Sequence, residues 1–141
     1  MTDFNQQYNN KLTTCDALVK QFKSGDIINL GAWYGEAYGV INALNENTDD
    51  LNEIYVSSAI ATCPSSYMEN ADIVVATGFF GPQERAIEAS GGNVHYTPIN
   101  YCDGIGLAQF GHKADYQIYR SGPMDERGDF NCSMTARTDY R

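Results

Sequence analysis

The sequence predicts an α/β domain with a mostly parallel sheet flanked by helices. Segments with strand character alternate with segments of helical periodicity, an order typical of β-α-β units whose strands run parallel. The length of 141 residues fits one domain. Hydrophobic residues make up 43% of the chain and aromatic residues 12%, which is enough to build a core. We therefore treat residues 1–141 as a single α/β domain.

Four segments carry helix signals. Thr13 or Thr14 can cap the first segment. Pro82 stands at the start of the third, where proline is tolerated. Glycines interrupt the second and the fourth and weaken both predictions. The four predicted helices are residues 11–22, 35–46, 82–90 and 104–112.

Six segments have the composition of strands, several of them rich in β-branched residues. The third is almost free of polar residues, and such a run is typical of a strand that is covered on both faces. Between the second and third segments, residues 63–70 contain Pro64 and are predicted to be a loop. The six predicted strands are residues 26–30, 53–60, 72–80, 93–98, 115–119 and 129–135.

The charge and cysteine content exclude several classes of protein. The net charge is −9, which makes nucleic acid and anionic membranes poor partners. The four cysteines form no C-x-x-C pair and there are two histidines, so we predict no metal site. The polar N-terminus shows no signal peptide, and no apolar run could span a membrane. We expect a cytoplasmic protein with free thiols.

In open α/β sheets, ligands bind at the carboxyl ends of the strands. Glycine-bearing turns follow four of the predicted strands, and their backbone N–H groups could hold a carboxylate, a phosphate or an oxyanion. None of them matches a dinucleotide-binding motif or a P-loop, and each glycine could serve turn geometry alone. The four turns read LGAWYGEA, FFGPQER, YTPINYCDGIG and SGPMDERG.

Several side chains near these turns allow two interpretations. Glu36 either stabilises the first turn of a helix through its dipole or points into a cleft. Asp125 either caps its own turn or accepts a hydrogen bond that fixes a loop over a substrate. Trp33 and its neighbouring tyrosine belong either to the core or to a pocket wall. We expect Glu84 and Glu88 to be solvated charges on a helix face.

Three stretches, in this order and spacing, resemble one known family. They are KSGDIINLGAWYGEAYGVINAL, FFGPQERAIEASGGNVHYTPI and GPMDERGDFN. They are similar to the acetyl-CoA hydrolase/transferase enzymes of the 4-hydroxybutyrate CoA-transferase type. Relatives often have histidine where Ala32 stands, proline where Ala37 stands and serine where Gly122 stands. These departures leave the acid specificity open.

The resemblance implies a function as the N-terminal part of a CoA-transferase. In that family each of two domains is α/β, and the active site lies between them. CoA moves between short-chain carboxylic acids of the acetate, butyrate or 4-hydroxybutyrate type, through a glutamyl-CoA thioester. The nucleophilic glutamate lies in the C-terminal half of the family, outside residues 1–141, so we expect this chain alone to be inactive. Coenzyme A would be bound as acyl-CoA.

Eight residues are expected to shape the cleft, and no catalytic residue is assigned within the chain. The implied partners are acyl-CoA, a small carboxylic acid and a C-terminal domain or subunit. The alternative is a non-catalytic truncated or split-subunit module that binds a partner and forms a homodimer in isolation. The eight candidate residues are Gly31, Gly35, Glu36, Gly81, Pro98, Pro123, Asp125 and Gly128.

Overall fold

The computed structural model describes residues 3–98, 100 and 113–131. In these residues five strands form one sheet in the order β4-β3-β2-β1-β5. Every pairing between neighbouring strands is parallel, so the predicted α/β class with a parallel sheet is confirmed. The strands are β1 (Ile27–Ala32), β2 (Ile54–Ala59), β3 (Ile73–Thr77), β4 (Val94–Tyr96) and β5 (Tyr116–Gln117).

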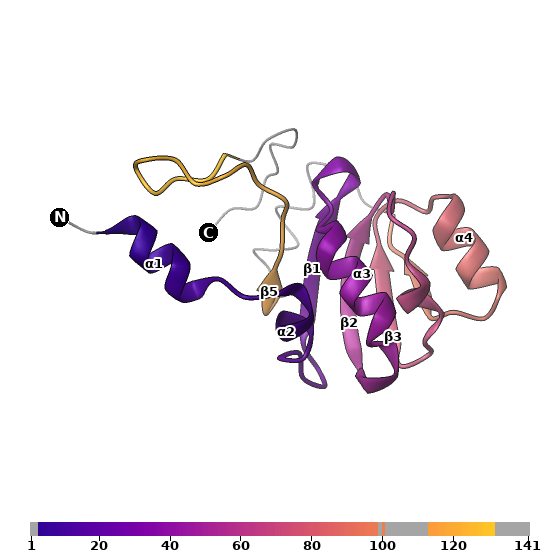
Figure 1. Cartoon of the computed structure of the whole chain (residues 1–141). Coiled ribbons are helices and arrows are strands. Elements are labelled where there is room, and N and C mark those ends of the chain that lie inside the picture. The colour runs from indigo at the N-terminus through magenta and orange to yellow at the C-terminus, as the bar shows by residue number, and fades with distance from the viewer. Residues whose placement is uncertain (1–2, 99, 101–112, 132–141) are drawn as a thin grey trace.

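Helices cover one face of this sheet. Figure 1 shows α3 lying across the front of the sheet, with α2 toward β5 and α4 beyond β3. The α-helices are α1 (Phe4–Lys11), α2 (Cys15–Val19), α3 (Tyr38–Glu46) and α4 (Pro82–Ala89). The short 3₁₀ helices are η1 (Trp33–Gly35), η2 (Thr48–Asp50) and η3 (Ser66–Glu69).

The core lies between the sheet and these helices. Alternate strand residues point toward the helices and are buried, as the period of two along a strand requires. The buried hydrophobic side chains of the strands are Ile28, Leu30, Ile54, Val56, Ile73, Val75 and Val94, and α3 adds Val40, Ile41, Ala43 and Leu44. On the other face Tyr55 is 47% exposed and Ala76 is exposed. Within the described residues, the prediction that the third strand is covered on both faces is therefore wrong.

The N-terminal helices differ from the prediction. The single helix expected over residues 11–22 is replaced by α1 and α2, because Leu12 ends α1 in an extended conformation. The Thr14 side chain then accepts a hydrogen bond from the Ala17 N–H at 3.1 Å, which confirms Thr14 as a cap. Helix α1 was not predicted since its sequence is polar, and none of its residues is buried. Its N-cap is Asp3, whose side chain accepts a hydrogen bond from the Gln6 N–H.

Other elements fall close to their predicted places. The second predicted helix begins at Tyr38, because Trp33–Gly35 turn separately as η1. The predicted loop at 63–70 contains η3, in which Tyr67 and Met68 are buried. Of the predicted last strand, the structure describes residues 129–131, where Phe130 forms one antiparallel bridge with Met124. The rest of that strand and the predicted helix at 104–112 lie outside the described residues. No described helix is long and apolar enough to cross a bilayer.

Candidate functional site

The carboxyl ends of β1, β2, β3 and β4 lie along one edge of the parallel sheet, which we call the carboxyl edge. Open parallel sheets bind ligands at this edge because the backbone turns away from the sheet there. Three turns between a strand and the next helix build most of it. They are residues 31–37, which begin with the last two residues of β1, residues 60–65 after β2 and residues 78–81 after β3.

The turn after β1 is shaped by glycine. Gly31 has φ +83°, and a Cβ there would lie 2.7 Å from the Gly35 carbonyl oxygen. The Gly31 N–H donates a hydrogen bond to Asn29 Oδ1 at 3.0 Å, so this N–H is already paired within the protein and is not offered to a ligand. Trp33 has φ 51°, which is unusual for a residue with a side chain. The turn is therefore compact and strained.

Glu36 is a buried residue that holds the neighbouring turn. Its side chain is 1% exposed. One carboxylate oxygen, Oε2, accepts hydrogen bonds from Thr62 N–H at 2.8 Å, Thr62 Oγ1 at 2.5 Å and Cys63 N–H at 3.2 Å. The first turn of α3 contains no acidic residue, so the interpretation of Glu36 as a helix-dipole partner is wrong. The carboxylate instead fastens the turn after β2 to the turn after β1.

Glu84 approaches the same turn from the other side. It is 0% exposed, and its Oε1 accepts from Ala61 N–H at 3.1 Å. The adjacent Gln83 donates from Nε2 to the Ala61 carbonyl at 3.1 Å. The prediction that Glu84 is solvated is wrong, whereas Glu88 is exposed as expected. A sequence signal existed, because Glu84 stands three residues before the buried Ile87 and so shares its helix face.

The charge of Glu36 influences two buried groups behind these turns. Burial, and then the nearby Glu36 carboxylate, raise the pKa of the Cys63 thiol. The same two causes raise the pKa of Tyr67 far above its usual range. Both groups therefore stay protonated and neutral at ordinary pH. Neither is suited to act as a nucleophile or a base.

Aromatic side chains line the carboxyl edge. Trp33 is 48% exposed, Tyr34 52%, Phe79 58% and Tyr96 51%. Exposure of this size excludes the core interpretation for Trp33 and Tyr34. The Phe80 and Tyr96 rings contact each other, with centroids 5.7 Å apart. Half-exposed rings on adjacent turns can stack on a flat ligand or meet another protein surface.

Arg120 ties the segment after β5 to the turn after β1. Its N–H donates to the Gly35 carbonyl at 3.2 Å, and its Nη2 donates to the Tyr34 carbonyl at 2.8 Å. The guanidinium carbon lies 4.7 Å from the centre of the Tyr38 ring, a cation–π distance. Sequence reasoning missed both Arg120 and Thr62, because neither belongs to a motif.

The remaining candidates from β3 and β4 lie at the carboxyl edge. Gly81 is the N-cap of α4, and its N–H donates to the Phe79 carbonyl at 3.0 Å. Pro98 is exposed just beyond β4. Thr97, which precedes it, donates its N–H to the Thr77 carbonyl at 2.9 Å. Pro98 thus follows a segment that is still tied to β3.

The last three candidates lie elsewhere. In Figure 1 the segment that follows β5 runs up and away from the sheet and arches over α1. Asp125 Oδ1 accepts from Arg127 N–H and Asp129 N–H, both at 2.9 Å, which confirms that Asp125 caps its own turn. Gly128 has φ +85°, and a Cβ there would lie 2.7 Å from Phe4 of α1. With Pro123, these residues form a hairpin beside α1.

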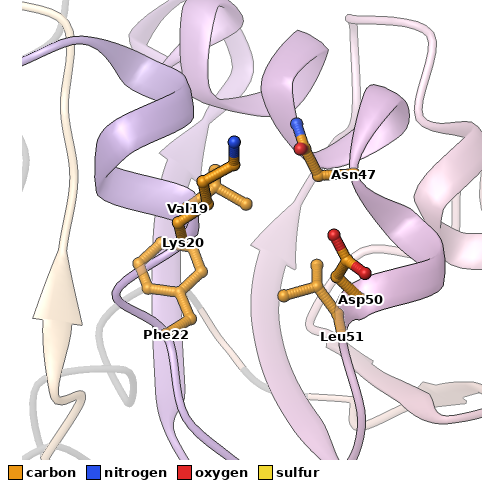
Figure 2. Close-up of a pocket in the computed structure, with 6 residues that line it drawn as sticks. All are labelled: Val19, Lys20, Phe22, Asn47, Asp50 and Leu51. Atoms are coloured by element: carbon orange, nitrogen blue, oxygen red, sulfur yellow. The ribbon is translucent and has the colours of Figure 1, made fainter.

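A cavity of about 260 Å³ lies at the opposite edge of the sheet, between α2 and η2. Figure 2 shows Lys20, Asn47 and Asp50 at its rim. Its residues come before β1 and β2 in the chain, away from the candidate site. Within the described part of the chain, no group of three or more His, Cys, Asp or Glu could hold a metal ion. The cavity is lined by Val19, Lys20, Phe22, Asn47, Asp50 and Leu51.

The fold and the interlocked turns define an α/β domain with its candidate site at the carboxyl edge of a parallel sheet. Residues 1–138 match the model of the acetyl-CoA hydrolase/transferase N-terminal domain, and the chain belongs to this family. The family identification made from the sequence is thereby confirmed.

Relatives and solved structures agree with this assignment. A butyryl-CoA:acetate CoA-transferase from Anaerostipes caccae is 28% identical, over 94% of this chain and 31% of that protein. RipA from Yersinia pestis superposes with a TM-score of 0.81 at 22% identity, over 93% of this chain and 33% of RipA. A single-residue mutant of RipA gives 0.83 at 24% identity. These structures support the fold, and the chain spans about a third of the length of these relatives.

Gly31 offers a test of how the turn after β1 is built. We expect Gly31→Ala to lower the free energy of unfolding by about 2–4 kcal/mol, because φ is positive and the new Cβ would collide with Gly35. Gly25→Ala is the matched control, since Gly25 has φ +90° but nothing within 4 Å of its Cβ position. That change should cost about 1–2 kcal/mol. Urea denaturation measures both, and equal losses would contradict the close approach.

Thiol labelling tests the burial of the edge. At pH 8 we expect iodoacetamide to label exposed Cys15 well before buried Cys63, whose raised pKa keeps its thiolate scarce. Labelling of Cys63 should speed up as the pH rises toward that pKa. Peptide mapping by mass spectrometry follows each site. In urea the two cysteines should react alike, and equal rates in the native protein would show that Cys63 is open to solvent.

Proposed function

We propose that the chain is the N-terminal part of a CoA-transferase. The transferase moves CoA between short-chain carboxylic acids of the acetate, butyrate or 4-hydroxybutyrate type, through a glutamyl-CoA thioester. The observation that carries this proposal is the family match over residues 1–138, together with the butyryl-CoA:acetate relative. The substrates are acyl-CoA and a small carboxylic acid, and the place of action is the cytoplasm. Residues 1–141 form one α/β domain of the larger protein.

The buried glutamates support a nucleophile outside this chain. A carboxylate that attacks a thioester must reach the substrate and have a free lone pair. Glu36 is 1% exposed and its Oε2 already accepts three hydrogen bonds, while Glu84 is 0% exposed. Both glutamates are enclosed, so neither can meet an acyl-CoA without breaking the turns. We therefore propose that neither glutamate of the carboxyl edge is the nucleophile, and that the reacting glutamate lies in the C-terminal part.

Within this chain, the role that we assign to the candidate residues is to shape and position the site. Gly31 and Gly35 let the turn after β1 fold back on itself, and Glu36 fixes it to the next turn. Gly81 and Pro98 lie on the turns after β3 and β4, and together with the aromatic side chains they would form the wall that faces acyl-CoA. Such a rigid wall contributes by orienting the reactants.

The three candidate residues of the hairpin lie away from the carboxyl edge, so they could contribute to the site only through contact with another surface. Pro123, Asp125 and Gly128 stand beside α1 rather than at the carboxyl edge. The Tyr8 and Phe130 rings join the two segments, with centroids 5.9 Å apart. We propose that this hairpin meets the substrate, or the C-terminal part, from outside the sheet.

The second candidate function is a non-catalytic module that binds a partner. The observation in its favour is the row of half-exposed rings at the carboxyl edge, from Trp33 to Tyr96. Exposed apolar surfaces of this kind mark contacts with other proteins. In the longer protein the C-terminal part would cover this surface, and in isolation a second copy of the chain would do so.

The enzymatic proposal predicts that this chain alone forms no covalent intermediate. We would incubate it with acetyl-CoA and butyrate and then trap thioesters with hydroxylamine or borohydride. The expected result is an unmodified chain and no exchange of CoA, because both glutamates of the carboxyl edge are buried and cannot reach the thioester. Mass spectrometry of the peptides reports the outcome. A modified glutamate anywhere in residues 1–141 would contradict the assignment.

The partner surface predicts self-association through the carboxyl edge. Sedimentation velocity at increasing concentration should show a dimer, and Tyr34→Ser with Phe79→Ser should lower its fraction because both rings are more than half exposed there. Tyr55→Ser is the control, since Tyr55 is 47% exposed but lies on the open face of the sheet. A monomer at every concentration, or an equal effect of Tyr55→Ser, would rule out this dimer.

A further inference from the structure

We infer that Glu84 is a positioning residue that, with Glu36, holds the turn after β2 in one shape between its two neighbours. Glu84 acts through the main chain of Ala61, and Glu36 acts through Thr62 and Cys63. The inference rests on the proposed function, because it concerns how the same carboxyl edge is kept ready for acyl-CoA.

Side chains at the start of α4 form hydrogen bonds with both the main-chain N–H and the main-chain carbonyl of Ala61. The Ala61 N–H donates to Glu84 Oε1 at 3.1 Å, and the Ala61 carbonyl accepts from Gln83 Nε2 at 3.1 Å. Consecutive residues of α4 thus hold the donor and the acceptor of Ala61. A fully buried carboxylate is tolerated only with hydrogen-bond donors. Moving Ala61 would leave Glu84 without the donor that its Oε1 has.

Glu36, in the turn after β1, forms hydrogen bonds with the next two residues, Thr62 and Cys63. Glu36 accepts from the N–H groups of Thr62 and Cys63, and from Thr62 Oγ1. The three successive N–H groups of residues 61–63 therefore all donate to buried carboxylates, from two different parts of the chain. Thr62 Oγ1 also lies 3.1 Å from Tyr38 Oη and 3.3 Å from the Trp33 carbonyl. Residues 61–63 thus join the turn after β1 to the start of α4.

The backbone is strained at two residues beside these hydrogen bonds, which indicates that the hydrogen bonds hold an unfavourable conformation. Ile60 has φ 58° although it is β-branched, and Trp33 in the adjoining turn has φ 51°. Such conformations are costly and persist where surrounding contacts over-determine them, most often at functional sites. Each strained residue stands at or next to the hydrogen bonds of Glu36 and Glu84. The two carboxylates hold conformations that the free chain would avoid.

A simple capping role for Glu84 does not fit. A glutamate three residues after an N-cap usually reaches back to the N-cap N–H. Here the Gly81 N–H donates to the Phe79 carbonyl, and α4 has no side-chain cap. A Cβ on Gly81 would lie 2.7 Å from Glu84 Oε2, so the glycine makes room for the carboxylate. Glu84 Oε2 has no hydrogen-bond partner among the described residues, and its other oxygen serves Ala61.

The test compares Glu84→Ala with Glu88→Ala, an exposed glutamate one turn later on α4. Hydrogen exchange by NMR reports on the Ala61 amide, and acrylamide quenching reports on Trp33, which is the one tryptophan of the chain. For Glu84→Ala we expect Ala61 to exchange about tenfold faster or more. Because 48% of Trp33 is already exposed, its quenching can rise by up to about twofold. Glu88→Ala should change neither.

A purely structural role would lower the melting temperature yet leave native Trp33 quenching and Ala61 exchange unchanged, and that result would overturn the inference. If Glu84→Ala does not fold, Thr62→Val provides the test instead. Thr62 is exposed, and this change removes the hydroxyl that donates a hydrogen bond to the Trp33 carbonyl. Unchanged Trp33 quenching in Thr62→Val would equally overturn it. Glu84→Gln keeps an acceptor for Ala61 and should restore slow exchange.

Titration with acetyl-CoA separates this inference from the proposed function. If the wild-type chain binds acetyl-CoA, Glu84→Ala should weaken binding while Glu88→Ala leaves it unchanged, and equal binding by all three would overturn the positioning role. If the wild-type chain shows no binding, the proposed role of this chain in holding acyl-CoA is refuted. Amide exchange and Trp33 quenching then still decide whether Glu84 holds the turn.

Discussion

The carboxyl edge depends on hydrogen bonds between two buried carboxylates and one short stretch of main chain. A carboxylate loses much of its hydration on burial, and donors must replace it. Glu36 and Glu84 obtain theirs from the N–H groups of residues 61–63. The turn in return obtains acceptors for N–H groups that follow a strand end and have no ladder partner there. Each side therefore stabilises the other.

These hydrogen bonds join two turns and the start of α4, whereas the hairpin after β5 is held by different contacts. The turns after β1 and β2 and the start of α4 share the contacts of Ala61 and Thr62. The hairpin is held to α1 by the pairing of Tyr8 with Phe130 and by the close contact of Gly128 with Phe4. None of the residues of α1 is buried, so in the described part of the chain the hairpin packs against an exposed helix. The edge is the better organised of the two surfaces.

The fold was readable from the sequence, while the interior of the site was not. Alternation along Ile54–Ala59 and the proline at the start of α4 locate their elements, since both act through local geometry. Glu84 was misassigned because a charge on a helix is usually solvated, and only its spacing from Ile87 indicated burial. Thr62 carried no signal at all. Its role arises from contacts with Trp33 and Glu36, which are distant in sequence, and no local pattern encodes such contacts.

The same contacts bear on how chemistry could be divided in the proposed enzyme. A carboxylate can position the main chain or act as a nucleophile, but a carboxylate that is enclosed by the protein cannot be approached by a substrate. Glu36 and Glu84 are built as anchors, and the exposed groups that the described part of the edge offers are chiefly aromatic rings and turns. These can orient and enclose an acyl-CoA but cannot accept an acyl group. A transferase that uses this edge would thus need its reacting carboxylate on the facing part, where it could move toward a wall that stays fixed.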